Sequence, residues 1–92
     1  MKITLNDWKK LSIHQLCEKY NLSTGDLYQG AVEQQLHKYS TPTERRKIGT
    51  SEKMFIKNNQ NLTVSEVANI LHKSYNATLI QIKMLGYYHM IG

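Results

Sequence analysis

Side chains that could act in catalysis are few in this sequence and lie far apart along it. No nucleophile stands near a base, and neither a pair of carboxylates nor a glycine-rich phosphate loop forms a recognisable constellation. We expect each of the four histidines to be a lone surface residue. These histidines are His14, His37, His72 and His89. The sequence therefore predicts that the protein is not an enzyme.

The single cysteine and the ends of the chain add little chemistry. Cys17 cannot form an internal disulfide, and we expect it to be a small core residue rather than a reactive thiol. No pair of Cys or His residues has the close spacing of a zinc site, so we expect neither a metal nor a cofactor. The N-terminal segment has no signal-peptide pattern, and no stretch approaches the roughly 20 apolar residues of a membrane span. We therefore expect a cytoplasmic protein without a membrane partner.

The charge of the chain points to an anionic partner. The formal net charge is +5 and the isoelectric point is about 9.4. Residues 1–39 hold five Lys against four acidic residues (5 − 4 = +1), whereas residues 40–92 hold seven Lys and Arg against three acidic residues (7 − 3 = +4). By charge alone, nucleic acid is the first candidate partner, and an acidic protein or a membrane surface is the second.

The basic half contains two predicted helices joined by a tight turn, in residues 62–86. Thr63 and Glu66 have the spacing of a capping box, which starts the first helix. Ala68 is the small residue on the apolar stripe of that helix, where a second helix can cross closely. Ser74 can cap the second helix, which ends at Gly86. This order and spacing are typical of a DNA-binding helix-turn-helix.

The rest of the chain also predicts helices and no strand, so the fold class is all-α. Before Pro42 we expect three helices: one over residues 6–11, one over residues 12–20, and one that begins at residue 23 or 24 and ends at about residue 39. After Pro42 we expect a further helix over residues 51–58. The chain then divides into an N-terminal helical unit, a basic linker and a C-terminal domain. Their bounds are residues 1–39, 40–50 and 51–92.

The two halves resemble each other at an offset of 51 residues. This offset places Ser12 on Thr63, Gln15 on Glu66 and Cys17 on Ala68. The capping box, the small residue and the turn thus recur in register. Two interpretations remain open: a second, degenerate helix-turn-helix in the N-terminal half, or the general likeness of any two capped amphipathic helices.

Residues 51–86 resemble the three-helix Myb-like and homeodomain-like helix-turn-helix domains of bacteria and phages. In that family an acidic residue opens the first helix, a Val-Ala step marks the second, and Leu-Gly ends the third. The matching residues here are Glu52, Val67, Ala68, Ser74, Leu85 and Gly86. Two positions depart from the pattern, because His72 stands where the family has Gly and Thr78 stands where it has an apolar residue.

The resemblance implies that the helix over residues 74–85 enters the major groove of double-stranded DNA. It implies that Asn76 pairs with adenine, that Tyr75 and Ser74 reach a base edge or a phosphate, and that Lys73 and Lys83 neutralise phosphates. Gln81 is a weaker candidate. For Asn76, a local turn or cap is an equal alternative to base contact.

The basic run just upstream, Arg45, Arg46 and Lys47, has two interpretations. It could be a flexible arm in the minor groove, as basic arms before three-helix domains sometimes are. It could also be a solvated linker, which we favour.

The last predicted helix is more apolar than one small domain needs. Leu79 and Ile80 point partly outward in the helical pattern, and Tyr87 and Tyr88 follow. We expect this surplus to pack against the N-terminal half or against a second copy of the chain. The sequence thus supports a small transcriptional regulator or DNA-binding accessory factor of a bacterium or phage. The alternative is a protein-interaction module, such as a small inhibitor of a host or cellular protein.

Overall fold

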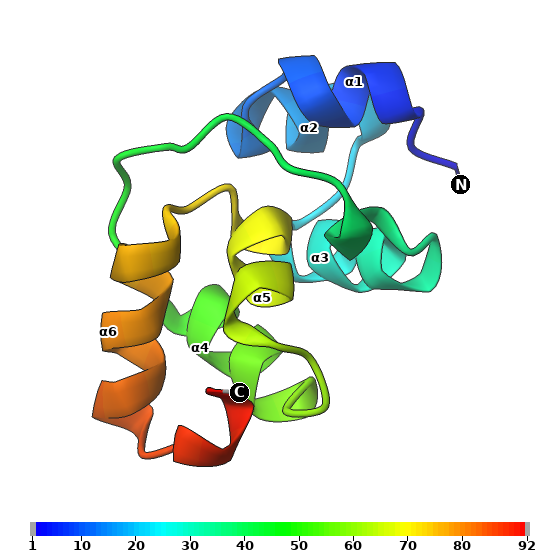
Figure 1. The fold of residues 1–92 in the computed structure, drawn as a ribbon. Coiled ribbons are helices and arrows are strands. Elements are labelled where there is room, and N and C mark those ends of the chain that lie inside the picture. The colour runs from blue at the N-terminus through cyan, green and yellow to red at the C-terminus, as the bar shows by residue number, and fades with distance from the viewer. Residues whose placement is uncertain (1, 92) are drawn as a thin grey trace.

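The computed structural model describes residues 2–91, and every regular element in that range is a helix (Figure 1). The elements are α1 (Leu5–Lys10), α2 (Ile13–Tyr20), α3 (Thr24–Glu33), η1 (Leu36–Lys38), α4 (Thr50–Asn58), α5 (Val64–Leu71), α6 (Tyr75–Leu85) and η2 (Tyr88–Met90), where η denotes a short 3₁₀ helix. The prediction of an all-helical chain is confirmed. No helix within residues 2–91 has the length and apolar content that crossing a membrane requires.

Side-chain caps start most of these helices. Five hydroxyl side chains each accept a hydrogen bond from the backbone N–H three residues further on. They belong to Thr4, Ser12, Ser23, Thr63 and Ser74. Both predicted capping boxes form. Since such a cap contributes about 1 kcal/mol, these residues fix where each helix begins.

The third helix is shorter than the sequence predicts. α3 ends at Glu33, whereas the prediction extended it to about residue 39. The side-chain amide of Gln34 pairs with the backbone N–H and C=O of Ile3, each at 2.8 Å, and so holds this helix end against the N-terminal segment. Gln35 then takes a left-handed conformation (φ 61°), which turns the chain out of the helix and into η1.

The turn geometry recurs at the predicted offset of 51 residues. Asn21 after α2 and His72 after α5 are both left-handed, with φ of 53° and 54°. We call α1–α3 the first or N-terminal copy and α4–α6 the second copy. The N–H of the residue after the left-handed one donates to the carbonyl of Cys17 in the first copy and of Ala68 in the second, at 3.0 and 3.1 Å. A serine two residues after the left-handed residue caps the next helix in both copies. The likeness therefore extends from the sequence to the local backbone.

A single hydrophobic core joins the two copies. Its fully buried side chains come from both halves of the chain: Trp8, Leu16, Leu27, Tyr28, Ile56, Val67, Ile70, Leu71 and Ile82. α3 packs against both α4 and α5, and α5 packs against α6 and η1. α3 and α5 thus form the centre of the molecule, while α6 lies at its margin (Figure 1).

The segment between the copies lies on the surface of α5. In Figure 1 residues 40–49 run in extended form past the C-terminal end of this helix. The backbone N–H of Glu44 donates to the carbonyl of His72 at 2.6 Å, and the hydroxyl of Thr41 donates to the carbonyl of Asn69 at 3.2 Å. The linker is therefore packed at these points and is not solvated along its whole length.

Candidate functional site

α6 is positioned by its inner side. Thr78 and Ile82 are fully buried there, and Leu79 and Leu85 are partly buried against the core. The hydroxyl of Thr78 donates to the carbonyl of Ser74 at 2.9 Å. This bond satisfies the polar group, so that a threonine can occupy a fully buried position on α6.

The opposite side of α6 is open to solvent. We call its six exposed residues the outer face of α6. They are Ser74, Tyr75, Asn76, Ile80, Lys83 and Met84. Asn76, Ile80 and Lys83 stand at i, i+4 and i+7 and therefore line one side of the helix. Four of the six, Ser74, Tyr75, Asn76 and Lys83, were predicted site residues, and the fold brings them together; Gln81 is only half exposed.

Ser74, and not Asn76, caps α6. Its hydroxyl accepts the N–H of Ala77 at 3.2 Å. Within residues 2–91 the Asn76 side chain forms no hydrogen bond, so it is not engaged as a local cap or turn residue. Its donor and acceptor remain free for an external partner.

Two of the cationic side chains predicted to contact DNA, Lys73 and Arg46, form hydrogen bonds within the protein. The ammonium group of Lys73 donates to the backbone carbonyl of Glu44 at 3.1 Å and also to that of Arg46. Arg46 itself is half-buried, whereas its neighbours Arg45 and Lys47 are exposed. In the predicted basic run, Arg46 is thus engaged within the protein, whereas Arg45 and Lys47 are exposed to solvent.

Arg46 joins the linker to three other parts of the fold. Its guanidinium lies 3.3 Å from Oε1 of Glu44 and 3.5 Å from Oε2 of Glu52, and it also donates to the carbonyl of Leu71. The other carboxylate oxygen of Glu44 accepts the first N–H of α2, from Ile13, at 2.9 Å. These contacts tie the end of α5 to the beginning of α2 and to α4.

His72 is buried in the turn between α5 and α6, so the prediction that it lies on the surface is wrong. Its ring meets the indole of Trp8 edge-on, with centroids 4.6 Å apart, and its Nδ1 lies 3.0 Å from Oε2 of Glu44. Burial lowers the pKa of His72, although the adjacent Glu44 carboxylate opposes this shift. The neutral ring therefore donates from Nδ1 to Glu44.

Glu52 and Tyr28 complete this polar network. The Tyr28 hydroxyl donates to Oε2 of Glu52 at 2.6 Å, and burial together with this bond raises the pKa of Tyr28. Burial alone would raise the pKa of Glu52, but the hydrogen bonds from Tyr28 and Gly49 and the charge of Arg46 lower it. The sequence did offer one signal for the network, because Glu44 and Glu52 are acidic residues within the basic half.

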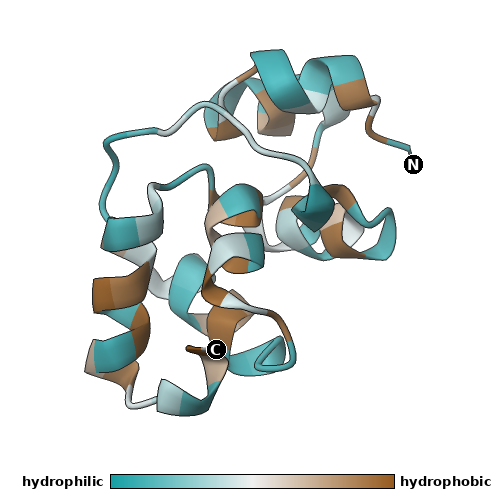
Figure 2. Cartoon of the chain, in the orientation of Figure 1, coloured by the Kyte–Doolittle hydropathy of each residue, from teal (hydrophilic) through white to brown (hydrophobic). Residues whose placement is uncertain are grey.

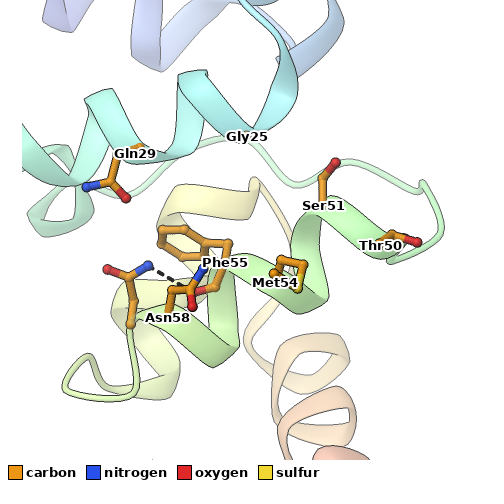
Figure 3. Close-up of a pocket in the computed structure, with 8 residues that line it drawn as sticks. Gly25, Gln29, Thr50, Ser51, Met54, Phe55 and Asn58 are labelled. Carbon is orange, nitrogen blue, oxygen red and sulfur yellow. Dashed lines mark hydrogen bonds between the residues drawn. The ribbon is translucent and has the colours of Figure 1, made fainter.

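Among the hollows of the described surface, the two best formed hold no catalytic chemistry. The first, of about 270 Å³, opens between α3 and α4 (Figure 3). Its lining is uncharged: Gly25, Gln29, Thr50, Ser51, Met54, Phe55, Asn58 and Asn59. The second, of about 280 Å³, lies beside α6 and is bordered by Thr63, Val64, Ser65 and Tyr75. Among residues 2–91, no three His, Cys, Asp or Glu side chains gather as metal ligands would.

No protein-family model, curated protein or solved structure matches the chain. The site must therefore be interpreted from its own residues. Three of its features bear on function: a capped helix at the margin of the fold, an unengaged amide near the start of that helix, and exposed cations on both the helix and the adjacent linker.

Proposed function

We propose that the protein binds double-stranded DNA, with α5 and α6 acting as a helix-turn-helix and α6 lying in the major groove. The observation that carries this proposal is the exposed outer face at the start of α6, where the side chains of Ser74, Tyr75 and Asn76 are uncovered. A recognition helix contacts base edges with its N-terminal residues, while the preceding helix crosses behind it. The contact of α5 with α6 across the turn of residues 72–74 supports this arrangement.

The contacts divide between base edges and phosphates. Asn76 offers the paired donor and acceptor that match adenine, and Tyr75 can reach a base edge or a phosphate. Lys83 on α6, with Arg45 and Lys47 on the linker, supplies exposed positive charge for phosphates. Lys73 contributes charge near the start of α6, but its hydrogen bonds to the linker keep it from the bases.

The N-terminal copy is unsuited to the same task. α3 is the counterpart of α6, and its exposed charged residues are Asp26 and Glu33. Two carboxylates on this helix would repel DNA phosphates. We therefore assign DNA binding to α5, α6 and the linker, and a structural role to the first copy. In this function the protein would act as a small transcriptional regulator or DNA-binding accessory factor.

A salt titration with duplex DNA tests the proposal. Selection from random DNA yields a preferred duplex, and fluorescence anisotropy then measures its affinity at increasing salt. Asn76→Ala should reduce binding to the selected duplex by about 5- to 150-fold and leave nonspecific binding unchanged, because one bidentate base contact contributes roughly 1–3 kcal/mol. Lys83→Glu should weaken binding to all duplexes and lower the salt dependence.

Lys10→Glu is the matched control for charge, because Lys10 is also exposed but lies on α1, away from α6 (Figure 1). It should reduce affinity less than Lys83→Glu does. Absence of any duplex binding above the nonspecific level at low salt would refute the proposal.

Exposed apolar side chains on α6 and η2 favour a second candidate function, docking of another protein. Ile80, Met84 and Tyr88 are 58%, 76% and 62% exposed, whereas Leu79 and Tyr87 are partly buried against the core. Figure 2 shows the corresponding hydrophobic bands on the outward side of α6. The N-terminal half does not cover Ile80, so of the two partners expected from the sequence only a second copy of the chain remains for this side chain.

If this surface joined two copies of the chain, the protein would be a dimer, and Met84→Glu would make it monomeric. Sedimentation measures this directly. A wild-type monomer at working concentration would exclude the dimer.

A further inference from the structure

The outer face of α6 has an uneven chemical composition. It carries an amide, a phenol, an exposed isoleucine and an exposed methionine, but residues 73–86 contain no arginine. Guanine is read in the major groove mostly by Arg or Lys, which donate to its O6 and N7. Lys73 is held by two backbone carbonyls, and Lys83 lies seven residues beyond Asn76, about 10 Å further along the helix axis. The N-terminal part of the face therefore lacks an unengaged Arg or Lys, the residues that most often read guanine.

The same face does carry the groups that distinguish an A·T pair. Thymine presents a C5-methyl group in the major groove, and apolar side chains contact it; adenine presents N6 and N7, which an Asn amide can pair with. We propose, on the basis of the DNA binding proposed above, that α6 reads A·T base pairs, with Ile80 packed against a thymine methyl and Asn76 bonded to adenine.

The spacing of Asn76 and Ile80 suits neighbouring base pairs. Residues at i and i+4 of a helix have Cβ atoms roughly 5–6 Å apart, and successive base pairs are about 3.4 Å apart along the DNA axis. The thymine and the adenine should thus lie within two steps of each other. Ile80 is also stiff at χ1, so little side-chain entropy is lost when it is ordered against a base.

Replacing thymine by deoxyuridine tests the methyl contact directly, since the two bases differ only in that group. The probe is the duplex selected from random DNA, with each thymine replaced in turn and the affinity measured by anisotropy. At one or two positions the replacement should weaken binding about fourfold, which is ~0.8 kcal/mol and the typical value for burying one such group. At the other positions it should have no effect.

Ile80→Ala should abolish the difference between the thymine and deoxyuridine duplexes while the protein still binds both. Met54→Ala is the matched control, because Met54 is also an exposed apolar residue (49%) but lies on α4 beside the first hollow (Figure 3). This variant should retain the difference. Thermal unfolding of both variants verifies that they fold.

The results separate this inference from the proposed function. If selected duplexes centre on guanine, or deoxyuridine is tolerated at every position, A·T reading is wrong and DNA binding stands. If Ile80→Ala still distinguishes the thymine duplex from the deoxyuridine duplex, another residue contacts the methyl group, and the inference is also overturned. If no duplex is bound above the nonspecific level, both proposals fail.

Discussion

At the scale of single residues, His72 is the side chain whose surroundings differ most from what its type suggests. A histidine in a solvent-facing turn would titrate freely, but this ring is enclosed between Trp8 and Glu44. Its Nε2 and the Trp8 Nε1 are both buried, and neither has a hydrogen-bond partner within residues 2–91. The left-handed backbone of His72 is therefore held by packing, by the side-chain bond to Glu44 and by the bond from the Glu44 backbone N–H to the His72 carbonyl.

The lowered pKa of His72 predicts an acid-sensitive fold. The unfolded chain binds a proton at this residue near the ordinary value of 6.5, whereas the folded chain binds it only at lower pH. Stability from this group is therefore complete above pH 6.5 and declines as pH falls below it, by at most about 1.4 kcal/mol per unit. Urea unfolding between pH 7.5 and about pH 5.5, followed by the fluorescence of Trp8, measures the slope.

His72→Gln is the comparison for this titration. It removes the titrating group, and the stability of this variant should depend less on pH over the same range, even if it is lower at every pH. An equal slope in both proteins would mean that other groups cause the effect.

The buried pair of Tyr28 and Glu52 gives a second prediction at this scale. Tyr28→Phe deletes one hydroxyl and leaves a carboxylate with 8% side-chain exposure short of its donor at 2.6 Å. We expect the free energy of unfolding to fall by about 1–3 kcal/mol, because the partner is charged. Tyr75→Phe is the matched control: this exposed hydroxyl forms no hydrogen bond within residues 2–91, so its loss should change stability by less than about 0.5 kcal/mol.

At the scale of helices and turns, the two copies provide an internal comparison. Asn21 and His72 share a left-handed conformation, but Asn21 is exposed and His72 is buried. Asn21→Gly should be neutral or slightly stabilising, because glycine adopts this conformation without a Cβ clash. His72→Gly relieves the same strain but removes the contact with Trp8 and the partner of Glu44, so it should cost about 2–4 kcal/mol. Thermal unfolding of the two variants measures the difference.

Helix starts were predictable from the sequence because they depend on neighbours within a few residues. The capping boxes at Ser12 and Thr63 and the cap at Ser74 each involve groups within three positions. The end of α3 was not predictable, because Gln34 pairs with Ile3, and these residues are 31 positions apart. Local sequence patterns thus predicted the helices but not the long-range contacts that determine where a helix such as α3 ends.

The candidate site also contains some features that local sequence determines and others that depend on long-range contacts. The exposure of Ser74, Tyr75 and Asn76 follows from helical periodicity, and the sequence placed them together. Lys73 donates to carbonyls of the linker, and Arg46 pairs with two carboxylates. Both sets of contacts depend on the path of residues 40–49. Charge alone could not separate these internal cations from the exposed Arg45 and Lys47.

At the scale of the whole molecule, the shared core makes the two copies a single cooperative unit. Trp8 and Leu16 of the first copy belong to the same buried cluster as Ile70 and Ile82 of the second, and the network around Arg46 joins both to the linker. Residues 40–92 form a unit of 53 residues, which is small enough to be only marginally stable without the rest of the shared core. We therefore expect residues 40–92 on their own to be largely unfolded by circular dichroism.

Cooperativity also predicts how mutations in either copy behave in the full chain. Leu16→Ala and Ile70→Ala each remove a fully buried side chain and should each lower stability by about 2–5 kcal/mol. Because the core is continuous, each variant should shift one common transition, seen at the same temperature by Trp8 fluorescence and by far-ultraviolet circular dichroism. Met84→Ala, at a 76% exposed position, should leave that transition in place. If instead Leu16→Ala shifts only the fluorescence transition while the helical signal melts later, the C-terminal half is stable by itself. The first copy would then not be needed to hold α5 and α6 in position.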